Sequence, residues 1–65
     1  MTIKQLIDSC ENINESTPFM LYDSVDDYDN CSCNWFRYNA ADIPDTAAKI
    51  AKFRIYNDFV AIALA

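Results

Sequence analysis

Apolar residues recur along this chain at two spacings, and each spacing predicts a different kind of element. Near the start they follow the i, i+3, i+4, i+7 pattern of one helical face, at Ile3, Leu6, Ile7 and Cys10. Thr2 precedes this pattern and Gln5 follows three positions later, which is typical of a capping box. We therefore predict a helix over about residues 3–12, with Cys10 on its buried face.

The next apolar segments predict a first β-hairpin. Residues 18–22 form a short apolar run that begins at Pro18, and the polar residues 23–30 are predicted to form a loop. The returning strand is predicted over residues 31–39. Because side chains alternate across a strand, one face of it carries Cys31, Cys33, Trp35 and Arg37. We expect Trp35 to lie in the interior, between the sheet and a helix.

A second hairpin is predicted near the C-terminal end. Asn57 and Asp58 separate two apolar segments, and Asn tolerates the positive φ that a tight turn requires. A two-residue turn places Tyr56 opposite Phe59. It also aligns large apolar side chains on one predicted core face, namely Phe53, Ile55, Val60, Ile62 and Leu64. Tyr56 and Phe59 fall on the other face, where they are candidate partner-binding residues.

A second helix is predicted between the hairpins, over about residues 44–51. Pro44 suits a first helical position, and Asp42 and Asp45 suit the positive end of a helix. The expected fold is one α+β domain over residues 1–65, in the order helix–hairpin–helix–hairpin. It has a four-stranded, mostly antiparallel sheet with two short helices on a single face. The apolar surface left on the other face predicts a homodimer or another partner.

The charge of the chain limits its partners. Ten acidic and five basic residues give a net charge of −5. Nucleic acids and anionic membranes should repel such a chain, because they are bound through Lys and Arg. A basic protein surface is the natural electrostatic partner. The start of the chain lacks the long apolar core of a signal peptide, and no apolar run is long enough to span a bilayer, so a cytoplasmic location is expected.

The predicted loop is the most acidic segment. Its candidate partner-binding residues are Asp23, Asp26, Asp27, Tyr28 and Asp29. An array of carboxylates can replace nucleic-acid phosphates in a basic groove, since binding there is mainly electrostatic. The alternative is an ordinary solvated loop. Calcium is not expected, because the segment lacks the Gly and the terminal Glu of an EF-hand loop.

The cysteines allow three interpretations. Cys31 and Cys33 follow the acidic segment, and Cys10 ends the predicted helix on its core side. Together with Asp29 they are a candidate zinc site, since thiolates and a carboxylate suit tetrahedral Zn²⁺. The alternatives are ordinary free or buried thiols, and a disulfide between Cys10 and one of the other two.

An enzyme is not expected. The chain contains no His and no Gly, which excludes Cys–His and Ser–His catalysis, His-ligated zinc and glycine-rich phosphate loops. A domain of 65 residues with one small sheet also leaves little room for a substrate pocket.

Three segments resemble short proteins from prophages and mobile elements of gut Firmicutes: Met1 to Ile7 (Met-Thr-Ile-Lys-Gln-Leu-Ile), Ala41 to Thr46 (Ala-Asp-Ile-Pro-Asp-Thr) and the closing hairpin. In size and acidity the chain also resembles type II anti-CRISPR proteins, which share no common motif. This resemblance implies a stoichiometric inhibitor that blocks an RNA-guided nuclease at its basic nucleic-acid channel or a recognition lobe. It also implies a location in the cytoplasm of a host bacterial cell, and it transfers no site residues. The alternative function is a zinc-stabilised structural or assembly module of a phage or mobile element.

Overall fold

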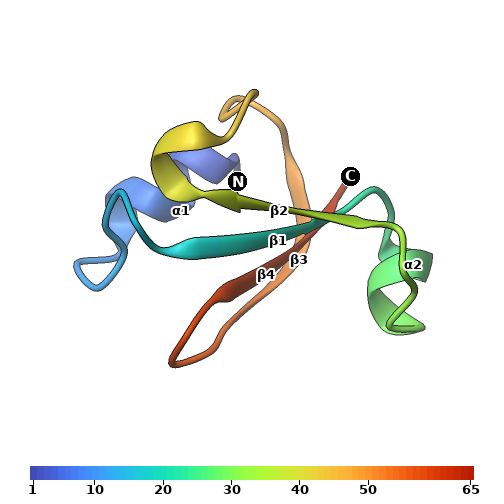
Figure 1. Ribbon diagram of the computed structural model, residues 1–65. Coiled ribbons are helices and arrows are strands. Elements are labelled where there is room, and N and C mark those ends of the chain that lie inside the picture. Colours follow the sequence, from blue (N-terminus) through green and yellow to red (C-terminus); the bar gives the residue numbers. More distant parts are fainter.

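The computed structural model describes residues 1–65 and shows a four-stranded sheet with two short helices (Figure 1). The strand order is β2–β1–β4–β3, so that β1 (Pro18–Tyr22) and β4 (Val60–Leu64) are central, and β2 (Trp35–Asn39) and β3 (Ile50–Ile55) are the edges. Both outer pairs are antiparallel, whereas the central β1–β4 pair is parallel. The predicted α+β class and the mostly antiparallel character are confirmed, whereas the predicted order helix–hairpin–helix–hairpin is not.

Helix α1 (Ile3–Ser9) begins with the predicted capping box. The Gln5 backbone N–H donates to Thr2 Oγ1 at 3.2 Å, and the Thr2 N–H donates to Gln5 Oε1 at 2.8 Å. The helix ends at Ser9, before the predicted end near residue 12, and Cys10 is its C-cap. None of the helices has the length and apolar character needed to cross a bilayer.

The predicted loop over residues 23–30 is wrong, because it contains helix α2 (Val25–Asp29). Ser24 caps this helix by accepting a hydrogen bond from the Asp27 N–H at 3.2 Å. Asp26 and Asp27 occupy the first turn, where the helix dipole favours negative charge. The local signal was therefore present as a Ser cap followed by two acids. The strand predicted over residues 31–39 also begins later, at Trp35, because Cys31 has a φ of 50° and the chain turns there.

The predicted second helix over residues 44–51 is absent. A 3₁₀ helix, η1 (Ala40–Asp42), precedes this segment, and strand β3 begins at Ile50. The backbone between them binds the start of α1: the Ile3 N–H donates to Ala48 O at 3.1 Å, and the Lys4 N–H donates to Thr46 O at 2.8 Å. These bonds satisfy N–H groups that the first turn of α1 leaves free. A contact distant in the sequence thus replaces the local helix.

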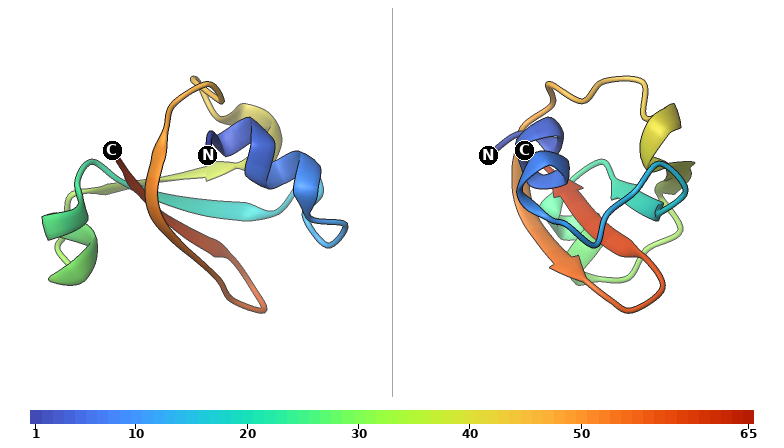
Figure 2. Two further views of the ribbon diagram at one scale, coloured as in Figure 1. Left: turned by 180° about the vertical axis from the view of Figure 1, so that it is seen from behind. Right: turned by 90° about the vertical axis from the view of Figure 1, so that its left-hand side faces the viewer.

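The main core lies between α1, η1 and one face of the sheet, here called the core face (Figure 2). Its buried members are Ile3, Leu6, Phe19, Leu21, Ala40, Ile43, Val60 and Ile62. The predicted register of the last two strands is present, with Phe53 opposite Ile62 and Ile55 opposite Val60. However, Phe53 and Ile55 are 43% and 48% exposed, because β3 is an edge strand that α1 covers only in part.

Candidate functional site

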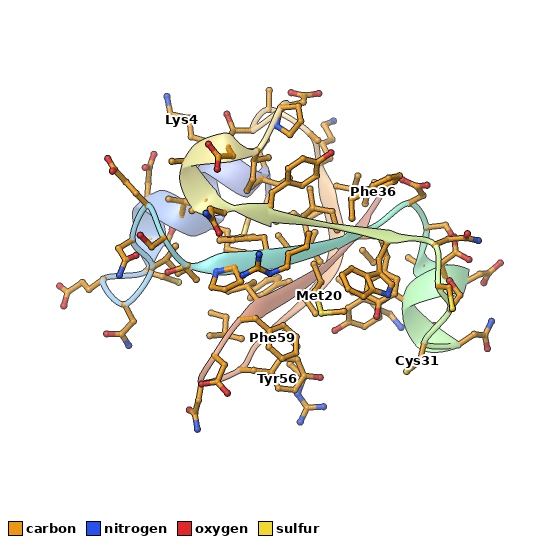
Figure 3. All side chains as sticks on the ribbon, in the orientation of Figure 1. Lys4, Met20, Cys31, Phe36, Tyr56 and Phe59 are labelled. Atoms are coloured by element: carbon orange, nitrogen blue, oxygen red, sulfur yellow. The ribbon has the colours of Figure 1, made fainter.

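The face of the sheet opposite α1, here called the outer face, carries aromatic and basic side chains. The strand register assigns two residues of each strand to this face: Met20 and Tyr22 of β1, Trp35 and Arg37 of β2, Lys52 and Arg54 of β3, and Ala61 and Ala63 of β4. Tyr56 and Phe59 lie beside them, next to the turn between β3 and β4. In Figure 3, Met20, Tyr56 and Phe59 lie together on this face, away from Phe36. Trp35 is 38% exposed here, so its predicted interior position is wrong.

The outer face has a depression over β4, because the side chains of β4 on this face are small. Ala61 lies between Met20 of β1 and Arg54 of β3, and larger side chains surround it. The resulting outer hollow has a volume of about 270 Å³. Its lining includes four of the seven predicted partner-binding residues, namely Tyr28, Asp29, Tyr56 and Phe59. The fold thus brings together residues from α2 and from the C-terminal turn.

Aromatic contacts hold the walls of the outer hollow. On one side, Tyr56 stacks on Phe59 with ring centroids 4.5 Å apart, and Arg54 Cζ lies 5.3 Å from the centre of the Tyr56 ring. On the other side, Tyr28 of α2 meets Tyr22 edge to face at 5.5 Å. Helix α2 therefore packs on the outer face, and the prediction of both helices on one face is wrong.

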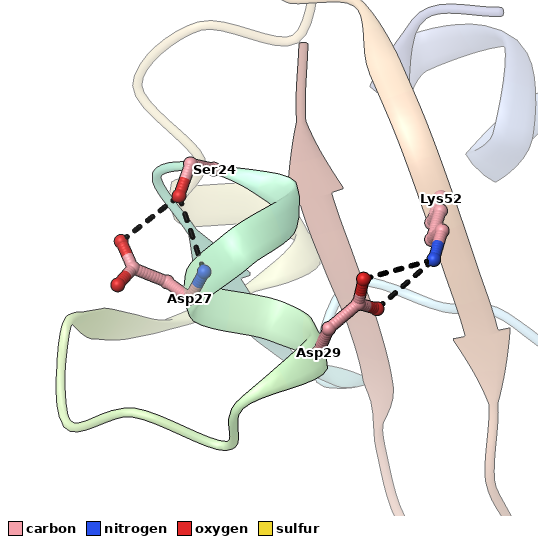
Figure 4. Close-up of polar contacts among 4 residues, drawn as sticks. All are labelled: Ser24, Asp27, Asp29 and Lys52. Atoms are coloured by element: carbon pink, nitrogen blue, oxygen red, sulfur yellow. Dashed lines mark hydrogen bonds and ion pairs between the residues drawn. The ribbon is translucent and has the colours of Figure 1, made fainter.

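Two of the four predicted loop acids stabilise α2 and its surroundings (Figure 4). Asp29 pairs with Lys52 of β3, at 2.9 and 3.2 Å from Nζ to the two carboxylate oxygens. Asp27 accepts hydrogen bonds from the hydroxyls of Ser24 at 3.1 Å and Ser32 at 3.0 Å. Asp23 and Asp26 are exposed, and their carboxylates make no hydrogen bond or ion pair. The free carboxylates of this segment are two rather than four.

Tyr22 lies near other phenol and thiol groups beside α2, namely those of Tyr28, Tyr56, Cys31 and Cys33. Burial raises the pKa of Tyr22 above its usual value of 10.0, and the negative charges that Cys31, Tyr28, Tyr56 and Cys33 acquire on ionisation raise it further. Tyr22 therefore keeps its proton at a pH where an exposed tyrosine would begin to lose it.

The residues of the predicted zinc site are not brought together. Cys10 ends α1 and packs against the core, whereas Cys31 and Cys33 are exposed beyond α2. The two helices lie at opposite ends of the sheet (Figures 1 and 2). No three Cys, Asp or Glu side chains are arranged to hold a metal ion, and all three thiols are free. The zinc site has no support in this arrangement, and neither has the alternative of a disulfide from Cys10.

A second hollow, here called the core-side groove, lies on the other face of the sheet. It also has a volume of about 270 Å³, and its walls include Leu21, Phe36, Tyr38, Ile43 and Leu64. Asp23 and Asp45 are its only charged lining residues. Sequence reasoning missed this groove, because its walls come from five separate parts of the chain. Of the residues that line the groove, only Asp23 was predicted from the sequence to bind a partner.

The two hollows differ in charge. The outer hollow combines Arg54 with the neutralised Asp29, whereas the core-side groove carries two carboxylates and no basic side chain. The core-side groove therefore carries uncompensated negative charge, whereas the outer hollow does not. No protein-family model, curated protein or solved structure matches this chain.

Proposed function

We propose that this chain is a small acidic inhibitor that acts stoichiometrically by binding a basic surface of a nucleic-acid-processing protein, specifically a type II RNA-guided nuclease. The supporting observation is that its carboxylates are almost entirely without cationic partners. The chain has ten acidic residues, and the Lys52–Asp29 pair is its only salt bridge. Unneutralised surface carboxylates create a negative potential that attracts a basic partner and accelerates association.

The arrangement of charge favours one side of the molecule for this contact. Three of the five basic residues, Arg37, Lys52 and Arg54, lie on the outer face. The exposed acids Asp23 and Asp45 instead line the core-side groove, and Asp26 lies in the first turn of α2. We therefore place the contact with a basic partner at the core-side groove, on Asp23 and the segment after η1, and extend it to the exposed Asp26 at the start of α2.

The proposed inhibitor acts by substitution. A nucleic-acid channel is lined with Lys and Arg side chains that pair with phosphates. Carboxylates held on a folded surface can form ion pairs with the same Lys and Arg side chains and so exclude the nucleic acid. The ordering cost is small, because α2 is already fixed by its Ser24 cap and by the Asp29–Lys52 pair. No chemical step is required of the chain.

The alternative, a zinc-stabilised module, has no observation in its favour. The homodimer stays a prediction.

DNA cleavage by a purified type II nuclease loaded with guide RNA tests the proposal. Cleavage should stop at about one chain per nuclease, and raised salt should weaken the inhibition, since the contact is electrostatic. The Asp23→Asn, Asp26→Asn double variant should inhibit less well. The matched control is Asp8→Asn, Glu11→Gln, which removes the same charge near the end of α1. Full cleavage in the presence of a large molar excess of the chain would refute the proposal.

A further inference from the structure

We infer that the core-side groove binds a short segment of the partner protein in which one large apolar side chain is flanked by Lys or Arg. The inference rests on the proposed function and specifies the part of the partner that makes the contact.

The groove exists because the cover of the core face is incomplete. Helix α1 has seven residues and lies over part of the sheet only, so that Leu21 and the residue opposite it on β2, Phe36, are left at an open end of the core. Ile3 and Ile43, which are 0% and 8% exposed, also line the groove. Phe36 is 57% exposed on β2. An apolar group entering this space would contact side chains that already belong to the core.

The size and chemistry of the groove fit a side chain better than a free small molecule. Its volume of about 270 Å³ is below the roughly 300–1,000 Å³ of typical ligand pockets. No buried side-chain polar atom lacks a hydrogen-bond partner, so no buried group awaits a polar ligand there. An apolar side chain gains from burial and needs no such group.

The charged residues of the groove specify what flanks that side chain. Asp23 follows β1 and Asp45 follows Pro44, so the two carboxylates come from separate segments. Neither is in a salt bridge. Asp45 Oδ1 accepts a hydrogen bond from the Ala47 N–H at 3.1 Å, which holds this carboxylate in place. Basic residues on either side of the inserted apolar group would pair with these acids, and acidic residues would be repelled.

A second copy of this chain does not meet these requirements. The chain has one segment of suitable composition, Lys52-Phe53-Arg54, and Phe53 is 43% exposed. In strand β3, however, Lys52 and Arg54 point to the outer face, where they contact Asp29 and Tyr56. If Phe53 entered the groove, its basic neighbours would point away from Asp23 and Asp45. We therefore assign the groove to a different protein.

Three synthetic peptides and isotope-labelled full chain test the inference by NMR. The probe peptide contains Lys-Leu-Arg, and the two controls contain Glu-Leu-Glu and Lys-Ser-Arg. The probe should shift the amide signals of Phe36, Tyr38 and Ala48, which line the groove. It should bind at least about tenfold more tightly than either control, since burial of one large aliphatic side chain is worth about that factor or more. Equal binding of a control peptide, or shifts centred on Met20 and Ala61, would overturn the inference.

Two matched variants connect the groove to inhibition. Phe36→Ser removes an exposed wall of the groove, whereas Phe53→Ser makes the same change on an edge strand outside it. Phe36→Ser should lower probe affinity about tenfold, and Phe53→Ser should not. Binding of the probe without inhibition of the nuclease would support the groove and refute the proposed function. Undiminished inhibition by Phe36→Ser would refute the groove and leave the proposed function standing. Self-association that both variants abolish would identify a second copy as the occupant and overturn the inference.

Discussion

Lys52 of edge strand β3 forms an ion pair with Asp29 at the end of α2, with Nζ 2.9 Å from Oδ1 and 3.2 Å from Oδ2. The pair joins segments 23 residues apart and attaches α2 to the edge of the sheet. Both side chains are about half exposed, at 50% and 47%, so water screens their attraction. The ion pair therefore positions α2 more than it stabilises the fold.

Asp29→Asn should lower the free energy of unfolding by less than about 1 kcal/mol, because exposed ion pairs contribute little. Ser24→Ala should lower it by about 0.5–2 kcal/mol, since it leaves the Asp27 N–H without its capping acceptor. Urea denaturation of both variants measures the two changes. A larger loss for Asp29→Asn than for Ser24→Ala would show that the ion pair is a principal support of α2.

Ile62→Ala and Ile55→Ala should differ strongly, although both residues belong to the predicted core. Ile62 is 0% exposed, and its truncation should cost about 2–5 kcal/mol. Ile55 is 48% exposed, and its truncation should cost less than about 1.5 kcal/mol, because much of its surface is already in water. Thermal or urea unfolding provides the comparison. Equal losses would mean that β3 is covered in solution by another surface.

The stability of the chain should fall at alkaline pH because of Tyr22. The folded state raises the pKa of Tyr22 above 10.0, so the folded chain holds this proton more tightly than the unfolded chain does. This contribution is complete below about pH 10 and is lost as the pH rises through the folded pKa. Unfolding measured from neutral to alkaline pH should show a steeper decline for the wild type than for Tyr22→Phe. Identical declines would contradict the raised pKa of Tyr22 in the folded chain.

The three thiols should react with an exposed-thiol reagent at two rates. Cys31 and Cys33 are exposed and should react fast, whereas Cys10 is partly buried against the core and should react more slowly until the chain is unfolded. Added Zn²⁺ should not raise the melting temperature of the reduced chain, since the thiols do not converge. Elemental analysis showing about one zinc per chain would contradict this expectation and restore the site predicted from the sequence.

Local signals were sufficient where an element depends on its near neighbours. Thr2 and Gln5 cap each other across three residues, as predicted. The two-residue connection at Asn57 and Asp58 has the predicted register, although neither residue has the positive φ that was expected there. The bounds of β1 follow from a single apolar run. A short helix such as α2 was missed, since its polar residues also suit a loop and only its Ser24 cap distinguishes it.

The sequence by itself determined the acidity of this protein, its α+β class and the start of α1, because charge, periodicity and capping depend on residue types at short spacing. Only the tertiary structure decided that β1 and β4 pair in parallel, that α2 packs on the outer face and that residues 46–48 bind the start of α1. It also decided that Asp27 and Asp29 have internal partners while Asp23 lines a groove with Asp45. These outcomes depend on which distant segments compete for the same hydrogen bonds and the same apolar surface, and a spacing along the chain does not specify that competition.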